Sequence, residues 1–211
     1  MEVAQVPKQV DHDERRREIV EALFRVAERD GLAAATYRTI AAEANVPAPQ
    51  VQYYFATKAD LIHGALFELG RRVVGRGMDL IGKAGPDPSP EVMLRAAVEG
   101  SHPVDDVTRQ ELVLFYLFFI AALSDQTVAE SGLIAAQRFI TTTFAEWIRT
   151  AQERGEVAPE VDPVHEARLV LFANSGIVLA ALVGIHTIED ATATMDYLLS
   201  KLFDRPSMTR A

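Results

Sequence analysis

The sequence predicts an all-α protein of about nine helices, and three observations support this fold class. Apolar residues recur at spacings of three and four along most of the 211-residue chain, and no convincing run alternates with period two. Proline and glycine fall mainly between these amphipathic stretches, where helices begin or end. The composition, with 49% hydrophobic and 24% charged residues, is that of a globular protein.

The N-terminal part predicts a long helix followed by two short ones. Apolar residues such as Ile19 and Leu23 form one stripe between residues 13 and 30, and Gly31 stands where that helix is expected to end. Thr36 is a suitable N-cap for the first short helix.

The spacing of the two short helices predicts a helix-turn-helix, whose second helix enters the major groove of DNA while the first braces it across the backbone. The turn requires a residue that tolerates left-handed geometry, and Asn45 can supply it. Pro47 and Pro49 fit only before or within the first turn of a helix, so the recognition helix is expected at about residues 48–54.

The rest of the chain predicts longer helices. One begins at Lys58, a Pro- and Gly-rich loop follows, and Ser89-Pro90 starts the next helix as cap and first turn. Further helices are expected at about 104–123, 127–154, 163–185 and 189–203. The domains are predicted as 11–57 and 58–205.

The apolar run at residues 167–185 is long enough to cross a membrane in principle. It contains Arg168, Asn174 and two glycines, so we favour a helix that is buried by its own core and by a partner subunit, without membrane contact.

Composition excludes several kinds of chemistry. Cysteine is absent, which removes disulfides, Cys-based zinc sites and thiol catalysis. The five histidines are scattered without metal-ligand spacing, and no phosphate loop, nucleophile elbow or dinucleotide fingerprint occurs. We therefore expect no enzyme activity, metal or cofactor. The N-terminus has no apolar stretch typical of a secretory signal, so a cytoplasmic protein is expected.

The net charge of −9 gives DNA binding no support by itself. Residues 1–60 carry 8 basic and 10 acidic side chains, however, so most of the acidity lies in the C-terminal part. A DNA-binding N-terminal segment remains open if its basic groups gather on one face.

The stretch from Thr36 to Leu61 resembles the DNA-binding domain of the tetracycline-repressor (TetR) family. The matching features are the Thr36…Ile40-Ala41 helix start, Ala44-x-Val46, the aromatic Tyr53-Tyr54-Phe55 and Lys58. The resemblance covers about fifty residues from Asp11. The remainder is similar to the family in length and helical pattern, and in detail to the choline-responsive betaine-pathway branch.

This resemblance implies a three-helix DNA-binding domain followed by a larger helical domain for ligand binding and dimerisation. The expected protein is a homodimeric regulator, a repressor by family default, that a small molecule releases from a pseudopalindromic operator. The alternative is an all-helical small-molecule-binding or interaction protein without DNA function.

Candidate DNA contacts lie on the second short helix and around it. The amides of Gln50 and Gln52 can pair bidentately with adenine, whereas Ala48 and Pro49 can offer only apolar contact to a thymine methyl. The resemblance implies phosphate contacts, which we assign to Thr36, Tyr53, Tyr54 and Lys58, with packing of the helix as the alternative role of the two tyrosines. Arg38 can contact phosphate or reach toward a groove. Residues 15–17, three arginines, are either a further phosphate contact or a solvated helix start.

Candidate effector contacts are less specific. Aromatic side chains are dense on the helix near residue 115, and aromatic walls with a few polar groups are typical of ligand sites. The candidates are Phe115, Tyr116, Phe119, Gln137, Trp147 and Asn174. They favour an apolar or aromatic, neutral or weakly anionic effector. The two amides can equally bond internally or across a subunit interface.

The last two helices are expected to pair with their symmetry mates in a four-helix dimer interface. Small residues would allow close helix approach along one face: Ala173, Gly176, Ala180 and Gly184.

Overall fold

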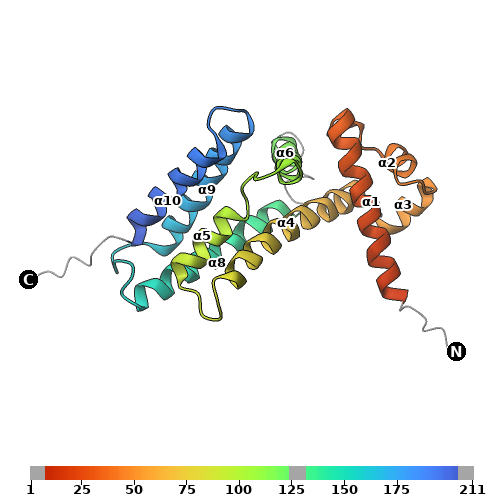
Figure 1. Cartoon of the computed structure of the whole chain (residues 1–211). Coiled ribbons are helices and arrows are strands. Elements are labelled where there is room, and N and C mark those ends of the chain that lie inside the picture. The colour runs from red at the N-terminus through yellow and green to blue at the C-terminus, as the bar shows by residue number, and fades with distance from the viewer. Residues whose placement is uncertain (1–7, 124–131, 204–211) are drawn as a thin grey trace, which may run out of the picture. The chain divides into compact units, whose positions relative to one another are not determined.

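The computed structural model describes residues 8–123 and 132–203, and these residues contain nine α-helices and one 3-10 turn (Figure 1). The all-α prediction is confirmed. The elements are α1 (Lys8–Asp30), η1 (Leu32–Ala34), α2 (Tyr37–Glu43), α3 (Ala48–Tyr54), α4 (Lys58–Lys83), α5 (Pro90–Glu99), α6 (Asp106–Ala121), α8 (Ile134–Glu153), α9 (Pro163–Leu182) and α10 (Ile188–Phe203). The start of the helix expected at 127–154 lies outside the described residues.

The described residues form two compact units. The first contains the chain up to Leu69 together with the part that begins at Leu114 and ends at Leu133. The second contains Gly70–Val113 and the chain from Ile134 onward. Helices α4 and α6 therefore each contribute to both units, while the expected domain boundary before Lys58 stays a prediction.

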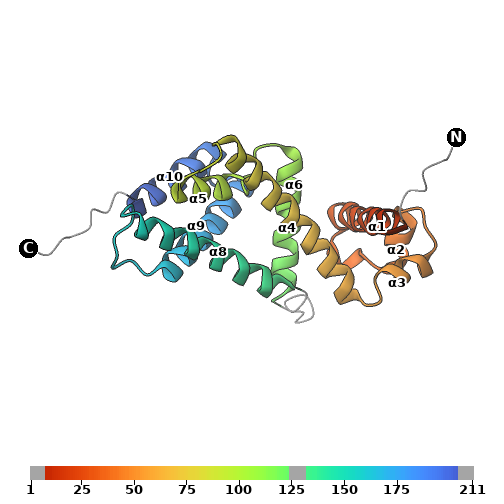
Figure 2. The same cartoon turned by 90° about the horizontal axis from the view of Figure 1, so that it is seen from below.

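The core of the first unit joins the three N-terminal helices to the beginning of α4 (Figure 2). Ile19, Ile40, Val51 and Phe55 are almost completely buried in it. Gly64 of α4 lies so close to the Phe55 ring that an added Cβ would be 2.7 Å from it. Since α6 also contributes Leu114 and Phe118, the unit is larger than a three-helix domain.

The core of the second unit is formed by α5, α8, α9 and α10. Leu94, Ile148, Val170 and Leu199, one from each of these helices, are buried at 0–1% exposure. Helix α9 packs against α8 and α10, and α5 packs against the same two helices, so the buried apolar residues of all four meet in this core.

The end of α9 differs from the expected 163–185. The helix ends at Leu182, and Gly184 has a left-handed φ of 79°. The N–H of Ile185 donates to the Ala180 carbonyl at 2.9 Å, which closes the helix end in a Schellman motif. Gly184 thus terminates the helix and does not continue its row of small residues.

Helix α9 is also the one described helix whose length and hydropathy would allow it to cross a membrane. Core helices of soluble proteins meet the same criteria, so this property is weak evidence.

Candidate nucleic-acid interface

The turn between α2 and α3 has the geometry that a helix-turn-helix needs. Asn45 adopts φ 53°, the one left-handed non-glycine residue in the described chain. The N–H of Val46 donates to the Ala41 carbonyl at 3.0 Å, and the N–H of Asn45 donates to the Ala42 carbonyl at 3.2 Å. This Schellman motif stops α2 and redirects the chain into α3, as the sequence predicted for Asn45.

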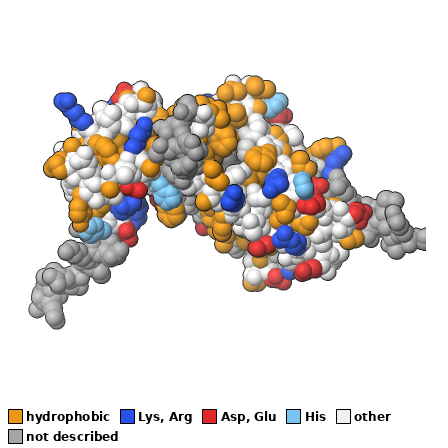
Figure 3. Space-filling view, turned by 180° about the vertical axis from the view of Figure 1, so that it is seen from behind, with side chains coloured by type: hydrophobic (Ala, Val, Ile, Leu, Met, Phe, Trp, Pro, Cys, Tyr) orange, Lys and Arg blue, Asp and Glu red, His pale blue; other side chains and the backbone are white. Residues whose placement is uncertain are grey.

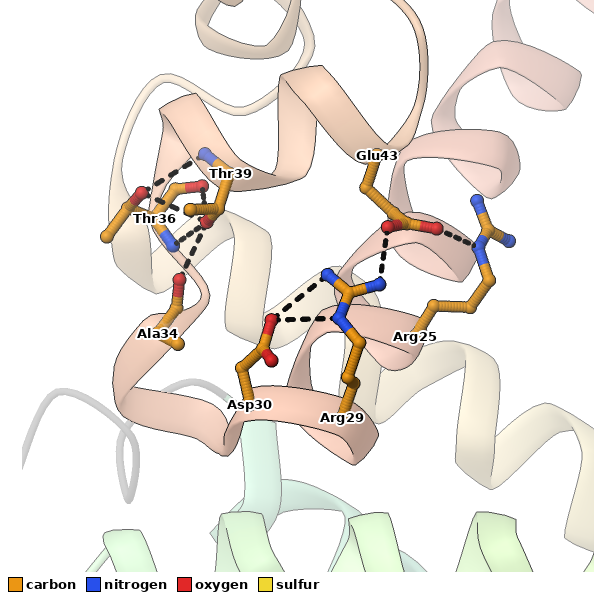
Figure 4. A network of polar contacts seen from close by, with 7 residues as sticks. All are labelled: Arg25, Arg29, Asp30, Ala34, Thr36, Thr39 and Glu43. Carbon is orange, nitrogen blue, oxygen red and sulfur yellow. Dashed lines mark hydrogen bonds and ion pairs between the residues drawn. The ribbon is translucent and has the colours of Figure 1, made fainter.

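The N-terminus of α2 is closed by a capping box (Figure 4). The N–H of Thr39 donates to the Thr36 hydroxyl at 3.2 Å, and the N–H of Thr36 donates to the Thr39 hydroxyl at 2.9 Å. The Thr39 hydroxyl also reaches the Ala34 carbonyl at 2.6 Å, which ties the helix start to η1. Thr36 is therefore the predicted cap, and its side chain stays exposed.

The C-terminal end of α2 is held to α1 by ion pairs (Figure 4). Arg25 Nε and Arg29 Nη1 donate to the two Glu43 carboxylate oxygens at 2.7 and 2.9 Å. These hydrogen bonds, from Arg25 first and then Arg29, hold the pKa of the Glu43 carboxyl below its usual range. The charge of the Glu43 carboxylate is thus compensated by two cations of the first unit.

The C-terminal end of α3 is held by side chains from α1 and α2. Arg16 Nη1 donates to the Tyr54 carbonyl at 2.6 Å, and its guanidinium carbon lies 4.4 Å from the centre of the Phe55 ring. The Tyr37 hydroxyl donates to the next carbonyl, that of Phe55, at 3.1 Å. Sequence reasoning considered Arg16 as a phosphate contact and did not foresee this contact.

Helix α3 presents a polar, uncharged surface. Pro49, Gln52 and Tyr53 are exposed, and Gln50 is half-buried. Ala48 packs against the core of the unit, so less of its methyl group is left to meet a base. The helix can therefore offer amides and a tyrosine to a groove, but no charged side chain.

The other predicted DNA contacts flank this helix. Arg38 and Lys58 are exposed, and Tyr54 is half-buried against the core. At the start of α4 the N–H of Thr57 donates to the Asp60 carboxylate at 3.0 Å, and the N–H of Asp60 donates to the Thr57 hydroxyl at 3.1 Å. Thr57 is thus the cap and Lys58 the first helical residue. The DNA contacts themselves stay predictions.

The predicted effector residues fall into both units. Phe115, Tyr116 and Phe119 belong to the first, where the Phe115 ring lies 5.7 Å from Tyr116 and 6.3 Å from Phe119. Burial raises the pKa of Tyr116 to about 12, so its phenol is neutral at pH 7. Phe119 is 43% exposed and therefore accessible.

The remaining three effector candidates belong to the second unit. Trp147 is half-buried and stacks on Phe144 at 5.6 Å. Among the described residues, no hydrogen-bond partner of the Gln137 amide is found. Asn174, in contrast, is 7% exposed and bonded internally.

Asn174 belongs to a buried polar cluster that joins the end of α5 to α9 and α10. Its Nδ2 donates to the Ser101 hydroxyl at 2.8 Å, and its Oδ1 lies 3.0 Å from His102 Nε2. His102 Nδ1 lies 3.2 Å from the Thr192 hydroxyl. Burial lowers the pKa of His102, and the hydrogen bond that His102 donates to the Asn174 amide oxygen partly offsets this decrease. The internal bonding foreseen as an alternative for Asn174 is thus present.

A buried carboxylate lies in the second unit with two arginines. Arg72 Nη1 and Arg76 Nη1 contact the two oxygens of Glu111 at 3.1 and 2.6 Å. Arg76 Nε also donates to the Gly100 carbonyl at 2.9 Å. The negative charge of Glu111 is therefore already compensated within the protein.

One side of α9 is apolar and uncovered in the single chain. Its exposed residues include Leu169, Phe172, Leu179 and Val183, which are 42–66% exposed. An added Cβ at Gly176 would meet nothing within 4 Å. Exposed hydrophobic side chains between charged ones are also visible on the face in Figure 3. Large apolar side chains that follow one helix face are typical of a protein interface.

Two family models match the chain. Residues 19–65 match the bacterial regulatory proteins of the tetR family, and residues 90–204 match the C-terminal domain of BetI-type transcriptional repressors. Together these segments include α2, α3 and most of the second unit.

Curated relatives and solved structures agree with these matches. The chain is 30% identical over 113 residues to the regulator PksA of Bacillus subtilis strain 168, covering 54% of each chain. It is 27% identical over 136 residues to the regulator BetI of Stenotrophomonas maltophilia strain R551-3, covering 64% of this chain and 68% of BetI. The chain thus spans about half the length of PksA and two thirds of that of BetI.

Two crystal structures show the same fold. A putative TetR-family regulator from a Rhodococcus species superimposes with a TM-score of 0.82 at 18% identity, covering 90% of this chain and 99% of that one. A putative regulator from Saccharomonospora viridis, in complex with choline, has a TM-score of 0.72 at 20% identity, covering 89% and 96%.

Proposed function

The chain belongs to the TetR family of DNA-binding transcriptional regulators, with a BetI-type repressor C-terminal domain, and from this premise we propose that it is a homodimeric, effector-controlled repressor. Regulators of this family are not enzymes. The proposed activity is binding of a pseudopalindromic operator through α3, release by a small molecule, and action in the cytoplasm, where the DNA is.

The observation that carries DNA binding is the α2–α3 turn together with the exposed face of α3. The left-handed Asn45 sets the angle between the helices, while Gln50 and Gln52 carry bidentate amides on α3. In a two-fold symmetric dimer the two α3 helices would enter successive major grooves about 34–36 Å apart. The two-fold symmetry makes the operator a pseudopalindrome, and the spacing sets the distance between its half-sites.

The dimer is supported by the uncovered side of α9. Leu169, Phe172 and Leu179 follow one helix face, and Gly176 between them leaves room for a second backbone. Glycine inside a helix costs about 1 kcal/mol relative to alanine, yet among the described residues nothing lies within 4 Å of a Cβ added at Gly176. We therefore place the interface on α9 and its neighbour α10.

The proposed effector is a neutral or weakly anionic molecule with apolar or aromatic parts. The candidate contacts Phe119 and Trp147 offer aromatic surface, and Gln137 offers an amide. The choline complex of the Saccharomonospora regulator raises the quaternary ammonium as a competing class. Glu111 does not favour it, because both carboxylate oxygens are engaged by Arg72 and Arg76.

The effector acts on DNA binding through differential affinity. It releases the operator if it binds more tightly to a subunit arrangement in which the two α3 helices no longer match successive grooves. Since Phe115, Tyr116 and Phe119 belong to the same unit as α3, a molecule that binds them contacts the DNA-binding unit itself.

A gel-shift with DNA from beside its own gene tests the function. Salt-sensitive binding that survives competition by unrelated DNA supports the repressor. Absence of binding at micromolar dimer favours the alternative, an all-helical small-molecule-binding or interaction protein without DNA function.

The effector class is tested by thermal shift and DNA release with choline, imidazole and benzoate as probes. Calorimetry then follows the active probe on wild type, Phe119→Ala and Gln137→Ala. Affinity that is unchanged in both variants would place the site elsewhere. If only choline releases the DNA, the effector is a cation and not a neutral or weakly anionic molecule.

A further inference from the structure

We propose that His12 and Arg16, on one face of α1, are positioning residues that fix the recognition helix α3, and that they act on operator binding through Tyr53. This inference rests on the proposed DNA-binding function and names residues that set its geometry. His12 and Arg16 are four residues apart, so they lie on the same side of α1.

Helix α3 needs external support because it is short. It has seven residues, its N-cap Pro47 makes no side-chain capping bond, and Val51 is its one buried residue. A helix of two turns is marginal by itself in water. By comparison, α2 has the same length but carries a capping box and the paired Glu43. The orientation of α3 therefore depends more on contacts at its C-terminal end.

Arg16 supplies the strongest of these contacts. The carbonyl groups in the last turn of a helix lack partners within the helix and carry partial negative charge. Arg16 donates to the Tyr54 carbonyl at 2.6 Å while its guanidinium lies over the buried Phe55 ring at 4.4 Å. One side chain thus binds both the last residue of α3 and the core residue that follows it. The hydroxyl of Tyr37, on α2, donates to the next carbonyl, that of Phe55, at 3.1 Å.

His12 contacts the two tyrosines at the end of α3. Its ring lies 5.3 Å from the Tyr54 ring and 6.0 Å from the Tyr53 ring. Tyr53 meets Tyr54 edge-on at 5.2 Å and is itself 72% exposed. Tyr53, the predicted phosphate contact, is therefore in ring contact with both Tyr54 and His12. Both of these residues connect Tyr53 to α1.

Positioning and direct phosphate contact give different results for Arg16. A phosphate contact releases counterions, so its loss lowers the salt slope of binding by about one per subunit. A positioning residue changes affinity through the helix that it holds. Its effect then depends on Tyr53 being present, which a double-mutant cycle measures.

The experiment compares Arg16→Ala with Arg17→Ala on the full-length protein and its operator. Arg17→Ala is the matched control, because it removes the same charge one residue away. The Arg17 Nε donates to the Asp13 carbonyl of its own helix at 3.3 Å and not to α3. Arg16→Ala is expected to weaken operator binding about tenfold more than Arg17→Ala, as expected for loss of a charge-assisted hydrogen bond. Arg16→Ala is expected to keep the salt slope of the wild-type protein.

The cycle with Tyr53→Ala separates positioning from a general loss of stability. In the Tyr53→Ala background the effect of Arg16→Ala is expected to shrink to roughly threefold or less, which is half of the tenfold effect on a logarithmic scale. A variant that merely lowers the folded fraction would weaken both backgrounds equally. Additive losses, or a salt slope of Arg16→Ala that falls by about one per subunit relative to wild type, would overturn the proposal.

His12→Ala provides a second variant that leaves the buried contacts of Arg16 in place. It is expected to weaken operator binding about threefold, because it removes the ring contacts of His12 with Tyr53 and Tyr54. In the Tyr53→Ala background His12→Ala is expected to have no effect. A loss that persists in Tyr53→Ala would contradict the role of His12 as a support for that residue.

Discussion

Helices α3 and α9 both present a surface that the single chain does not cover, but the two surfaces differ in kind. The exposed residues of α3 include Gln52 and Tyr53, which can hydrogen-bond. Those of α9 include Leu169 and Phe172, which cannot. Nucleic acid is recognised by directional polar groups, whereas subunits associate by burying apolar area. The comparison teaches that the chemistry of an uncovered helix face indicates its partner.

The two helices are also held in different ways. Twenty-residue α9 is anchored by a buried stripe and by Asn174, which bonds to side chains beyond the end of α5. Seven-residue α3 buries Val51 and relies on hydrogen bonds at its end. Burial along a long helix leaves little freedom, while end contacts permit small adjustments. Variants at the two surfaces should therefore differ in what they change.

The largest effect is expected at α9. Gly176→Trp adds a large side chain where the single chain leaves open space, so the subunit should still fold while the dimer cannot form. Loss of the second half-site contact should reduce operator affinity about 100-fold or more. Sedimentation and gel-shift measure the two effects. A variant that stays dimeric with wild-type affinity would place the interface elsewhere and weaken the comparison.

A smaller and more selective effect is expected at α3. Gln50→Ala removes an amide that can pair with a base, which should cost about 1–3 kcal/mol of discrimination at one position in each half-site. Binding to a panel of operator variants measures it, with Gln52→Ala as the matched amide deletion. Unchanged preference in both variants would contradict base reading by these amides.

Lys58→Ala should instead weaken binding to all sequences alike. Lys58 is the first residue of α4, and loss of one phosphate contact should reduce affinity roughly fivefold per subunit and the salt slope by about one. Titrations at several salt concentrations measure both. Lys83→Ala, at the other end of the same helix, is the control. A changed base preference in Lys58→Ala would reverse the roles assigned to Lys58 and Gln50.

The smallest effect concerns pH and the unit that contains α9. Burial lowers the pKa of His102 in the folded state, so the unfolded chain binds this proton more readily. The free energy of unfolding should then decrease as the pH falls below the unfolded value of about 6.5. His102→Gln keeps a side chain that can bond to Asn174 but does not titrate. The melting temperature should decrease less between pH 7.5 and pH 5.5 in this variant than in wild type. Equal decreases would exclude His102 as the cause of the pH dependence.

Much of the DNA-binding region could be predicted because its signals are local. The cap at Thr36, the left-handed Asn45 and the proline-marked start of α3 follow from the conformational preferences of single residues. The effector region was less predictable, since whether a buried amide faces a ligand or another side chain depends on distant residues. Asn174 meets Ser101 and His102, about seventy positions away, and periodicity does not encode such a meeting.

The sequence by itself determined the helices, the turn and the family, because these depend on neighbours within a few residues along the chain. The tertiary structure decided which polar groups are already paired. Arg16 is of a residue type that can contact phosphate, but its guanidinium binds the Tyr54 carbonyl and lies over the Phe55 ring. Glu111 is of a residue type that can bind a cation, but Arg72 and Arg76 already occupy both of its oxygens. A charge is defined by its residue type, whereas its partner is selected by packing between segments that only the folded chain brings together.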